Sequence, residues 1–157
     1  MKGLRLFVIA LVALIAIPAF AQDKPASNME ILRQKIKADK KLLVAANMDL
    51  TESEAKGFWP VYDAYQADLQ MLNERLGKLI VRYADLYNSK TLTDETAKSL
   101  FDEALAIEQA EVSMKQGYVP KLAAVLPATK VVRYLQIENK IRAVIKYELA
   151  DGIPLVP

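Results

Sequence analysis

The side chains of this chain that could carry acid–base or metal chemistry are mainly carboxylates, because its 157 residues include no histidine and no cysteine. Without these residue types there is no Ser-His-Asp or Cys-His nucleophile, no imidazole or thiolate metal site and no disulfide. A glycosidase-like carboxylate pair is compatible with the composition, but it needs a shaped cleft, which a narrow helical bundle seldom provides. We therefore expect a binding protein rather than an enzyme, without catalytic residues, metal or cofactor.

The N-terminal segment has the pattern of a secretory signal peptide. Lys2 and Arg5 precede an uncharged, apolar run from Leu6 to Ile17, and the small-residue pattern Ala19-Phe20-Ala21 follows. The apolar run is shorter than the roughly 18 residues needed to span a bilayer, so we expect a periplasmic protein without stable membrane insertion. The predicted parts are a signal peptide over residues 1–21, a disordered tail over 22–26 and a single helical domain over 27–157.

The charge of the mature chain is balanced. The signal peptide holds two of the 21 basic residues and none of the 19 acidic ones, so 19 of each sign remain after cleavage. The basic pI of the whole chain therefore does not indicate a nucleic-acid partner, and none is expected.

Apolar spacing predicts four helices and no strand. The first begins at a capping box formed by Ser27 and Glu30 and ends near Asn47. Its apolar face consists of Ile31, Leu32, Ile36, Leu43 and Ala46. The four methionines of the mature chain are too scattered for a copper site and are interpreted as core filling: Met29, Met48, Met71 and Met114.

The second predicted helix is the longest. Thr51 and Glu54 form a capping box at its start, and apolar residues recur at alternating spacings of four and three from Phe58 to Leu86. Such a sustained pattern is typical of a helix that packs lengthwise on a partner helix. We expect the helix to end before a turn at Asn88-Ser89-Lys90.

The last two helices also carry start and stop signals. Thr93 caps the third, Pro127 suits the first turn of the fourth, and Gly152 is placed to terminate it. The apolar seam of the third helix is interrupted by one charged residue, Glu111, and consists of Ala97, Leu100, Ala104, Ile107, Met114, Tyr118 and Leu122. Short turns make consecutive helices antiparallel. The sequence therefore predicts an all-α fold, a curved four-helix bundle of long antiparallel hairpins.

The antiparallel register makes two further predictions. In the hairpin of the second and third helices, residues at one level have numbers that add to about 180, so Pro60 and Pro120 lie at the same level. Each proline kinks its helix, and we expect the hairpin to bend there; two independent, harmless kinks are the alternative. The register of the third and fourth helices sets Glu111 opposite Arg142, where we predict an ion pair because a charge in an apolar seam is costly unless paired.

Two of the predicted helices begin with a similar five-residue motif, Leu50-Thr51-Glu52-Ser53-Glu54 and Leu92-Thr93-Asp94-Glu95-Thr96. Leu50 and Leu92 are expected to plug the end of the core, while the threonine caps the helix and acidic residues favour its positive end. Because of this motif, the signal peptide and the four helices, the chain resembles the Spy/CpxP-like LTxxQ-motif family of periplasmic proteins. The stretch Phe58-Trp59-Pro60-Val61-Tyr62-Asp63-Ala64-Tyr65 is similar to that of a group of exported bacterial proteins placed beside this family.

This resemblance implies a curved, often dimeric helical cradle that holds unfolded clients without ATP, or a modulator of envelope-stress signalling. The glutamine that closes the family motif is replaced here by Glu54 in the first copy and Thr96 in the second. The metal-responsive relatives use histidine-rich ligands, so metal sensing is not implied for this chain.

Two surfaces are candidates for recognition. Trp59, Tyr62 and Tyr65 gather near the start of the second helix, where the seam spacing favours packing for the tyrosines and leaves Trp59 open between packing and client contact. A basic face could attract acidic clients or lipid head groups, or could consist of solvated outer positions. Its residues are Lys35, Lys37, Lys40, Lys41, Lys130, Arg133 and Arg142. The residues predicted to contact a client are Trp59, Tyr62, Tyr65, Lys37, Lys40, Lys41 and Arg133.

The leading functional prediction is an ATP-independent holdase or envelope-stress protective protein of the periplasm, whose partners are unfolded or partly folded envelope proteins. The alternative is a regulatory protein that binds the periplasmic domain of one sensor kinase or one envelope complex. A structural protein acting through self-assembly is a third possibility, since sustained seams are compatible with a homodimer.

Overall fold

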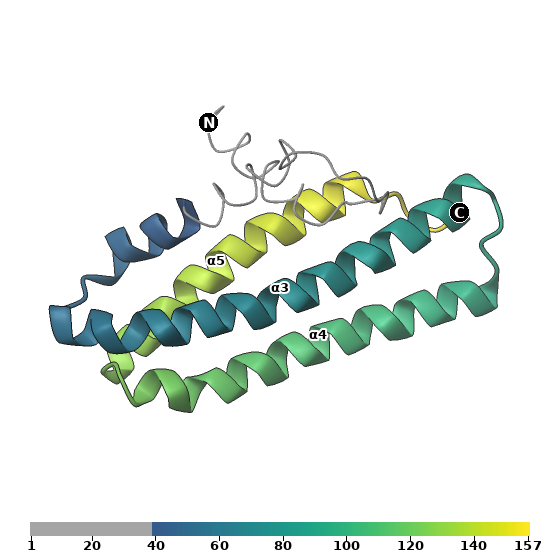
Figure 1. The fold of residues 1–157 in the computed structure, drawn as a ribbon. Helices are drawn as coiled ribbons and strands as arrows, with labels where there is room; N and C mark the ends of the chain where they lie inside the picture. The colour runs from purple at the N-terminus through teal and green to yellow at the C-terminus, as the bar shows by residue number, and fades with distance from the viewer. Residues whose placement is uncertain (1–38) are drawn as a thin grey trace, which may run out of the picture. The chain divides into compact units, whose positions relative to one another are not determined.

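The computed structural model describes residues 39–157, and these residues contain helices and no strand. Residues 39–48 are helical and are followed by α3 (Glu52–Asn88), α4 (Asp94–Ala123) and α5 (Ala128–Gly152) (Figure 1). The prediction of an all-α helical bundle is confirmed. The predicted signal peptide, the tail and the Ser27 capping box lie outside the described residues, and none of the described helices is long and apolar enough to cross a membrane.

The described residues form two compact units. The first comprises residues 39–53 and 127–155, so it contains the short helix 39–48 and α5. The second comprises residues 54–126, which form nearly all of α3 and the whole of α4. The first unit therefore joins two segments that lie far apart in the sequence, whereas the second is formed by one continuous segment.

The predicted helix boundaries agree with the structure to within about one residue. α3 begins at Glu52, directly after Thr51. Thr93 is the N-cap of α4 and forms a full capping box with Thr96, whose backbone N–H donates to Thr93 Oγ1 at 3.3 Å while Thr93 N–H donates to Thr96 Oγ1 at 2.8 Å. Pro127 is the N-cap of α5 rather than a residue of its first turn. Gly152 is the last residue of α5, as expected for a terminator.

The turn between α3 and α4 follows from local chemistry. Ser89 Oγ donates to the carbonyl of Asp85 at 2.7 Å, and Thr91 N–H donates to the carbonyl of Leu86 at 3.0 Å, so carbonyls at the end of α3 are satisfied. Lys90 adopts a left-handed φ of 57° and reverses the chain. The predicted turn is therefore present.

Contacts between α3 and α4 have the predicted antiparallel register. Arg75 pairs with Glu103, and the rings of Tyr65 and Tyr118 lie 5.2 Å apart. Just after the end of α4, Val125 lies 3.0 Å from where a Cβ at Gly57 would be. In each case the two residue numbers add to within a few of 180. α3 and α4 both continue through their prolines, Pro60 and Pro120, and the bend at that level stays a prediction.

The seam of α3 is buried along only part of its length. Its first four positions, from Phe58 to Leu69, are buried, whereas the later seam positions from Leu72 to Leu86 are half-buried. On α4 the buried positions are Leu100, Ile107, Glu111, Tyr118 and Leu122, which follow the predicted seam and include its one charged residue. The seam spacing thus identifies the inward face correctly but not its depth of burial.

The buried face of helix 39–48 differs from the prediction. Val44 and Met48 are fully buried, whereas Leu43 and Ala46 are exposed. The run Leu42-Leu43-Val44 places apolar side chains around more than half of the helix circumference, so spacing alone could not select a face. Val44 and Met48 lie on the same i, i+4 line as Lys40, which contacts α5.

Candidate binding site on the α3–α4 hairpin

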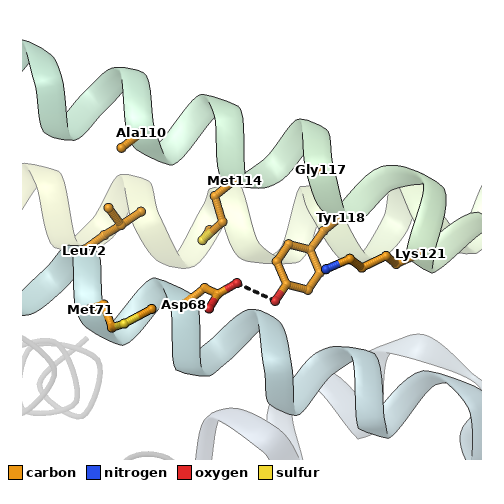
Figure 2. Close-up of a pocket in the computed structure, with 8 residues that line it drawn as sticks. All are labelled: Asp68, Met71, Leu72, Ala110, Met114, Gly117, Tyr118 and Lys121. Carbon is orange, nitrogen blue, oxygen red and sulfur yellow. Dashed lines mark hydrogen bonds between the residues drawn. The ribbon is translucent and has the colours of Figure 1, made fainter.

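An open pocket of about 370 Å³ lies between α3 and α4. Its lining residues are Asp68, Met71 and Leu72 from α3, and Ala110, Met114, Gly117, Tyr118 and Lys121 from α4 (Figure 2). All of them belong to the same compact unit. The pocket has an apolar part formed by the methionines, Leu72 and Ala110, and a polar end where Asp68, Tyr118 and Lys121 meet.

A short hydrogen bond fixes the polar end. Tyr118 Oη donates to Asp68 Oδ2 at 2.6 Å, as the dashed line in Figure 2 shows. The ring of Tyr118 is buried and packs edge-on against Tyr65 at a centroid distance of 5.2 Å. Burial, together with the hydrogen bond to Asp68 and its negative charge, raises the pKa of Tyr118 to about 12. The phenol therefore stays protonated and remains a hydrogen-bond donor at physiological pH.

A cation completes this end of the pocket. Lys121 Nζ lies 4.3 Å from the centroid of the Tyr118 ring, within cation–π range. The ammonium thus lies over the ring of Tyr118 and the carboxylate at its hydroxyl, and both residues line the pocket (Figure 2). Such an end can recognise a polar or charged group next to an apolar one.

The apolar part of the pocket is adaptable. Met71 is 62% exposed although it is a large apolar residue, and Met114 lies across from it on α4 (Figure 2). A Cβ at Gly117 would meet no atom within 4 Å, so this side of the pocket is left open by the missing side chain. Thioether side chains with three rotatable bonds adjust to differently shaped apolar groups. The interpretation of Met71 as core filling is wrong, whereas Met48 is indeed a core residue.

Two of the three aromatic residues predicted to contact a client are core residues. Tyr62 and Tyr65 are 3% and 1% exposed, because the seam turns both inward, and they offer no surface to a partner. Trp59 is half-buried and forms edge-to-face contacts with Phe58 and Tyr62, with centroid distances of 5.0 and 5.3 Å. For this cluster the packing alternative holds at Tyr62 and Tyr65, and Trp59 keeps one partly accessible face.

Three residues of the predicted basic face form contacts within the first unit. Lys40 Nζ forms a salt bridge with Glu138 at 2.9 Å, and the Glu138 side chain is only 3% exposed. Arg133 Nε donates to the backbone carbonyl of Asn47 at 2.5 Å, and Lys130 Nζ donates to that of Asp49 at 2.7 Å. Lys40 is therefore a largely buried structural residue rather than part of an open binding surface, whereas Arg133 is exposed, and its contact with a client stays a prediction. Lys41 is half-buried, and Lys37 lies outside the described residues.

These cations act at the end of a helix. Helix 39–48 ends at Met48, and Asp49 adopts a left-handed φ of 47° that stops it. The last carbonyls of a helix lack intrahelical partners and carry partial negative charge. Arg133 and Lys130 from the first two turns of α5 supply donors to this end. The basic residues that looked like a docking face thus cap a neighbouring helix.

Both members of the predicted Glu111–Arg142 pair are buried, Glu111 in α4 and Arg142 in α5. Glu111 Oε1 accepts a hydrogen bond from Lys115 Nζ, one turn further along α4, at 2.8 Å. The local lysine therefore neutralises part of the Glu111 charge, and the pairing with Arg142 stays a prediction.

Sequence reasoning missed a second ion pair of the hairpin. Arg75 Nε and Nη2 donate to the two carboxylate oxygens of Glu103 at 2.5 and 3.0 Å. The hydrogen bonds to Arg75 lower the pKa of Glu103, and those to Glu103 raise the pKa of Arg75. The predicted register could have revealed this pair, as it could have placed Asp68 near Tyr118. Over the described part of the chain, no group of three or more Asp or Glu residues is placed to hold a metal ion.

Comparison with known proteins gives no relative from which a function could be transferred. No protein-family model, no curated protein and no solved structure matches the chain.

Proposed function

We propose that this protein is an ATP-independent holdase of the bacterial periplasm that binds exposed apolar segments of unfolded or partly folded envelope proteins. The observation that carries the proposal is the open pocket on the α3–α4 hairpin, where Met71, Leu72 and Met114 lie beside the Asp68–Tyr118–Lys121 end. The N-terminal signal pattern and the resemblance to the Spy/CpxP-like family support the location and the class of protein.

The chemistry of the pocket suits a client with a mixed surface. Apolar side chains of an unfolded segment gain free energy when they leave water against Met71 and Met114. The carboxylate of Asp68 and the ammonium of Lys121 can then contact the polar groups that flank such side chains. A shallow pocket of this kind binds many sequences weakly and releases them without an energy source, as a holdase requires.

Light scattering of an aggregating client tests this proposal. The mature protein at near-equal molar ratio is expected to suppress aggregation. A Met71→Glu variant, which places a charge in the pocket at an exposed position, should suppress it less. Val132→Glu is the matched control, because Val132 is 54% exposed on α5 and does not line the pocket. Absence of suppression by the unmodified protein across salt concentrations would refute the proposal.

A regulatory protein with one dedicated partner is the second candidate. The observation in its favour is the fixed geometry at the polar end, where the 2.6 Å Tyr118–Asp68 hydrogen bond holds both groups in one arrangement. Fixed polar groups favour one complementary surface over many. Crosslinking in cells separates the two functions, because a regulator gives one stoichiometric partner and a holdase gives many.

A further inference from the structure

The pocket on the α3–α4 hairpin exposes sulfur, an easily oxidised atom. The sequence has no cysteine, so the thioethers of its methionines are its only sulfur groups. Met71 is 62% exposed, whereas Met48 is fully buried and belongs to the other compact unit. Met114 is half-buried and lines the same pocket as Met71 (Figure 2). Because oxidation depends on access to the sulfur, these three side chains should react in the order Met71, Met114, Met48.

Oxidation turns the apolar thioether into a polar group. A peroxide transfers one oxygen atom to the sulfur, so methionine becomes methionine sulfoxide, and hydrogen peroxide is reduced to water. The sulfur gives up two electrons, and no bond of the side chain breaks. The product is a hydrogen-bond acceptor where the pocket had an adaptable apolar group. Methionine sulfoxide reductases restore the thioether, and two thiols supply the electrons and become a disulfide, with release of water.

The pocket is poorly equipped to hydrogen-bond a sulfoxide oxygen on Met71. Among the side chains that line it, Tyr118 and Lys121 carry polar hydrogens. Tyr118 donates its hydroxyl proton to Asp68 at 2.6 Å, and Lys121 Nζ lies over the Tyr118 ring at the polar end. A sulfoxide on Met71 therefore takes its hydrogen bonds from water, which an apolar ligand displaces. Binding that removes hydrogen bonds without replacing them is weakened.

We propose that Met71 is a site of reversible oxidation to methionine sulfoxide, and that this modification lowers the affinity of the pocket for apolar groups. Met114, on the opposite helix of the same pocket, is oxidised more slowly and adds to the effect. The oxidation of Met71 does not depend on what the protein does, whereas its consequence for clients rests on the proposed holdase function. Client binding is thereby linked to the level of oxidant.

Nuclear magnetic resonance of the mature protein with isotope-labelled methionine methyl groups measures the order of oxidation. Methionine and its sulfoxide give separate methyl signals, and substitution of each methionine by leucine assigns them. With hydrogen peroxide, the Met71 signal should convert at least about tenfold faster than the Met48 signal, because only Met71 is open to the oxidant. Met29 lies outside the described residues, and its signal does not enter the comparison. Equal rates at Met71 and Met48 would overturn the proposal.

The same signals measure binding at the pocket. Anilinonaphthalenesulfonate serves as the apolar probe, and the shift of the Met114 methyl signal gives its dissociation constant. Conversion of Met71 should weaken probe binding by about tenfold. Met71→Leu replaces the sulfur by carbon, so the same peroxide treatment should change its probe affinity much less. Met48→Leu is the matched control and should stay as sensitive to peroxide as the unmodified protein.

Each protein is compared with its own untreated sample, so a change in basal affinity does not enter the result. Circular dichroism checks that every variant is folded. The proposal is overturned if conversion of Met71 leaves the probe affinity unchanged, or if peroxide weakens probe binding equally in Met71→Leu and in the unmodified protein.

Light scattering of an aggregating client separates this proposal from the proposed function. An untreated protein that does not suppress aggregation refutes the holdase function, while loss of probe binding on oxidation still supports the modification of the pocket. If suppression is the same before and after complete conversion of Met71, the holdase function stands and the proposed regulation is overturned. Methionine sulfoxide reductase with dithiothreitol should restore suppression, because it returns the thioether.

Discussion

Both helix pairs of the described chain have buried apolar residues and charged contacts, but the charged contacts are placed differently. In the first unit, helix 39–48 contacts α5 through the Lys40–Glu138 salt bridge and through Arg133, which donates to the carbonyl of Asn47. Lys130 donates to the carbonyl of Asp49, directly after the helix. In the second unit, α3 packs on α4 through a seam of aromatic and aliphatic side chains, such as Tyr65 on Tyr118. The short helix 39–48 also buries Val44 and Met48 completely, so its charged contacts with α5 add to apolar packing.

This difference shows that basic residues clustered in the sequence can form contacts within the fold. A cluster of basic residues in a protein of balanced charge first suggests a surface for acidic partners. Here Lys40 and Arg133 form contacts within the first unit, and the candidate pocket lies on the hairpin that was expected to be ordinary core. Four sets of substitutions test this comparison, described from the largest expected effect to the smallest.

Removal of an aromatic side chain from the second unit should have the largest effect. Phe58 is fully buried, so Phe58→Ala is expected to lower the free energy of unfolding by about 3–5 kcal/mol through lost burial and a residual cavity. Urea unfolding measures the change. Leu79→Ala, at a half-buried seam position of the same helix, is the matched control and should cost clearly less. Equal losses would show that burial does not differ between the two parts of the α3 seam.

Removal of one charge from the first unit should cost about 3 kcal/mol. Lys40→Met leaves the buried Glu138 carboxylate without its ammonium partner. The double variant Lys40→Met/Glu138→Leu should regain much of that stability, because the buried carboxylate is removed together with its ammonium partner. Urea unfolding of both variants provides the test. If the double variant is no more stable than Lys40→Met, the salt bridge is not what determines the loss.

Loss of the pocket hydrogen bond should cost about 1.5 kcal/mol at neutral pH and depend on pH. Tyr118→Phe removes the donor to Asp68. Because folding raises the pKa of Tyr118 to about 12 from an unfolded value near 10, the native state holds this proton more tightly. The contribution is complete below about pH 10 and is lost as the pH rises through about 12.

Urea unfolding of the unmodified protein and of Tyr118→Phe at pH 8 and near pH 12 measures this dependence. The stability difference between the two proteins should shrink at the higher pH. A difference that is constant over this range would contradict the raised pKa of Tyr118.

Two helical glycines should respond in opposite directions to substitution by alanine. A Cβ at Gly57 would lie 3.0 Å from both Cβ and Cγ1 of Val125, and the Val125 Cβ cannot move without its backbone. Gly57→Ala should therefore destabilise by about 1 kcal/mol, even after the gain in helix propensity. Gly117→Ala has open space and should stabilise by about 0.5–1 kcal/mol. Thermal unfolding measures both, and a shift of the same sign would show that Val125 can yield.

Much of the fold could be predicted because its signals are local. The Thr93 capping box, the end of α5 at Gly152 and the seam of α4 depend on residues within a few turns of one another. The antiparallel register also followed from the short turn after Asn88. The buried face of helix 39–48 could not be predicted, because three consecutive apolar residues make its faces nearly equivalent until α5 selects one.

The candidate site was less accessible to sequence reasoning. Tyr118 was placed correctly in the seam, and the antiparallel register could have put Asp68 at nearly the same level, but the register does not show that the two side chains form a hydrogen bond. Met71 and Met114 were separated by 43 positions of sequence, and only the packing of α3 on α4 puts both at one opening. Nothing in the local pattern distinguishes a methionine that fills a core from one that lines a pocket.

The sequence by itself determined the helical class, the helix ends and the inward faces of α3 and α4, because hydrogen-bonded caps and helical periodicity are properties of neighbouring residues. Only the tertiary structure decided how deeply each seam is buried, which charged side chains form ion pairs and which apolar side chains stay accessible. Those outcomes depend on the distances between helices, and a side chain's burial or electrostatic partner is set by what the other helix places opposite it.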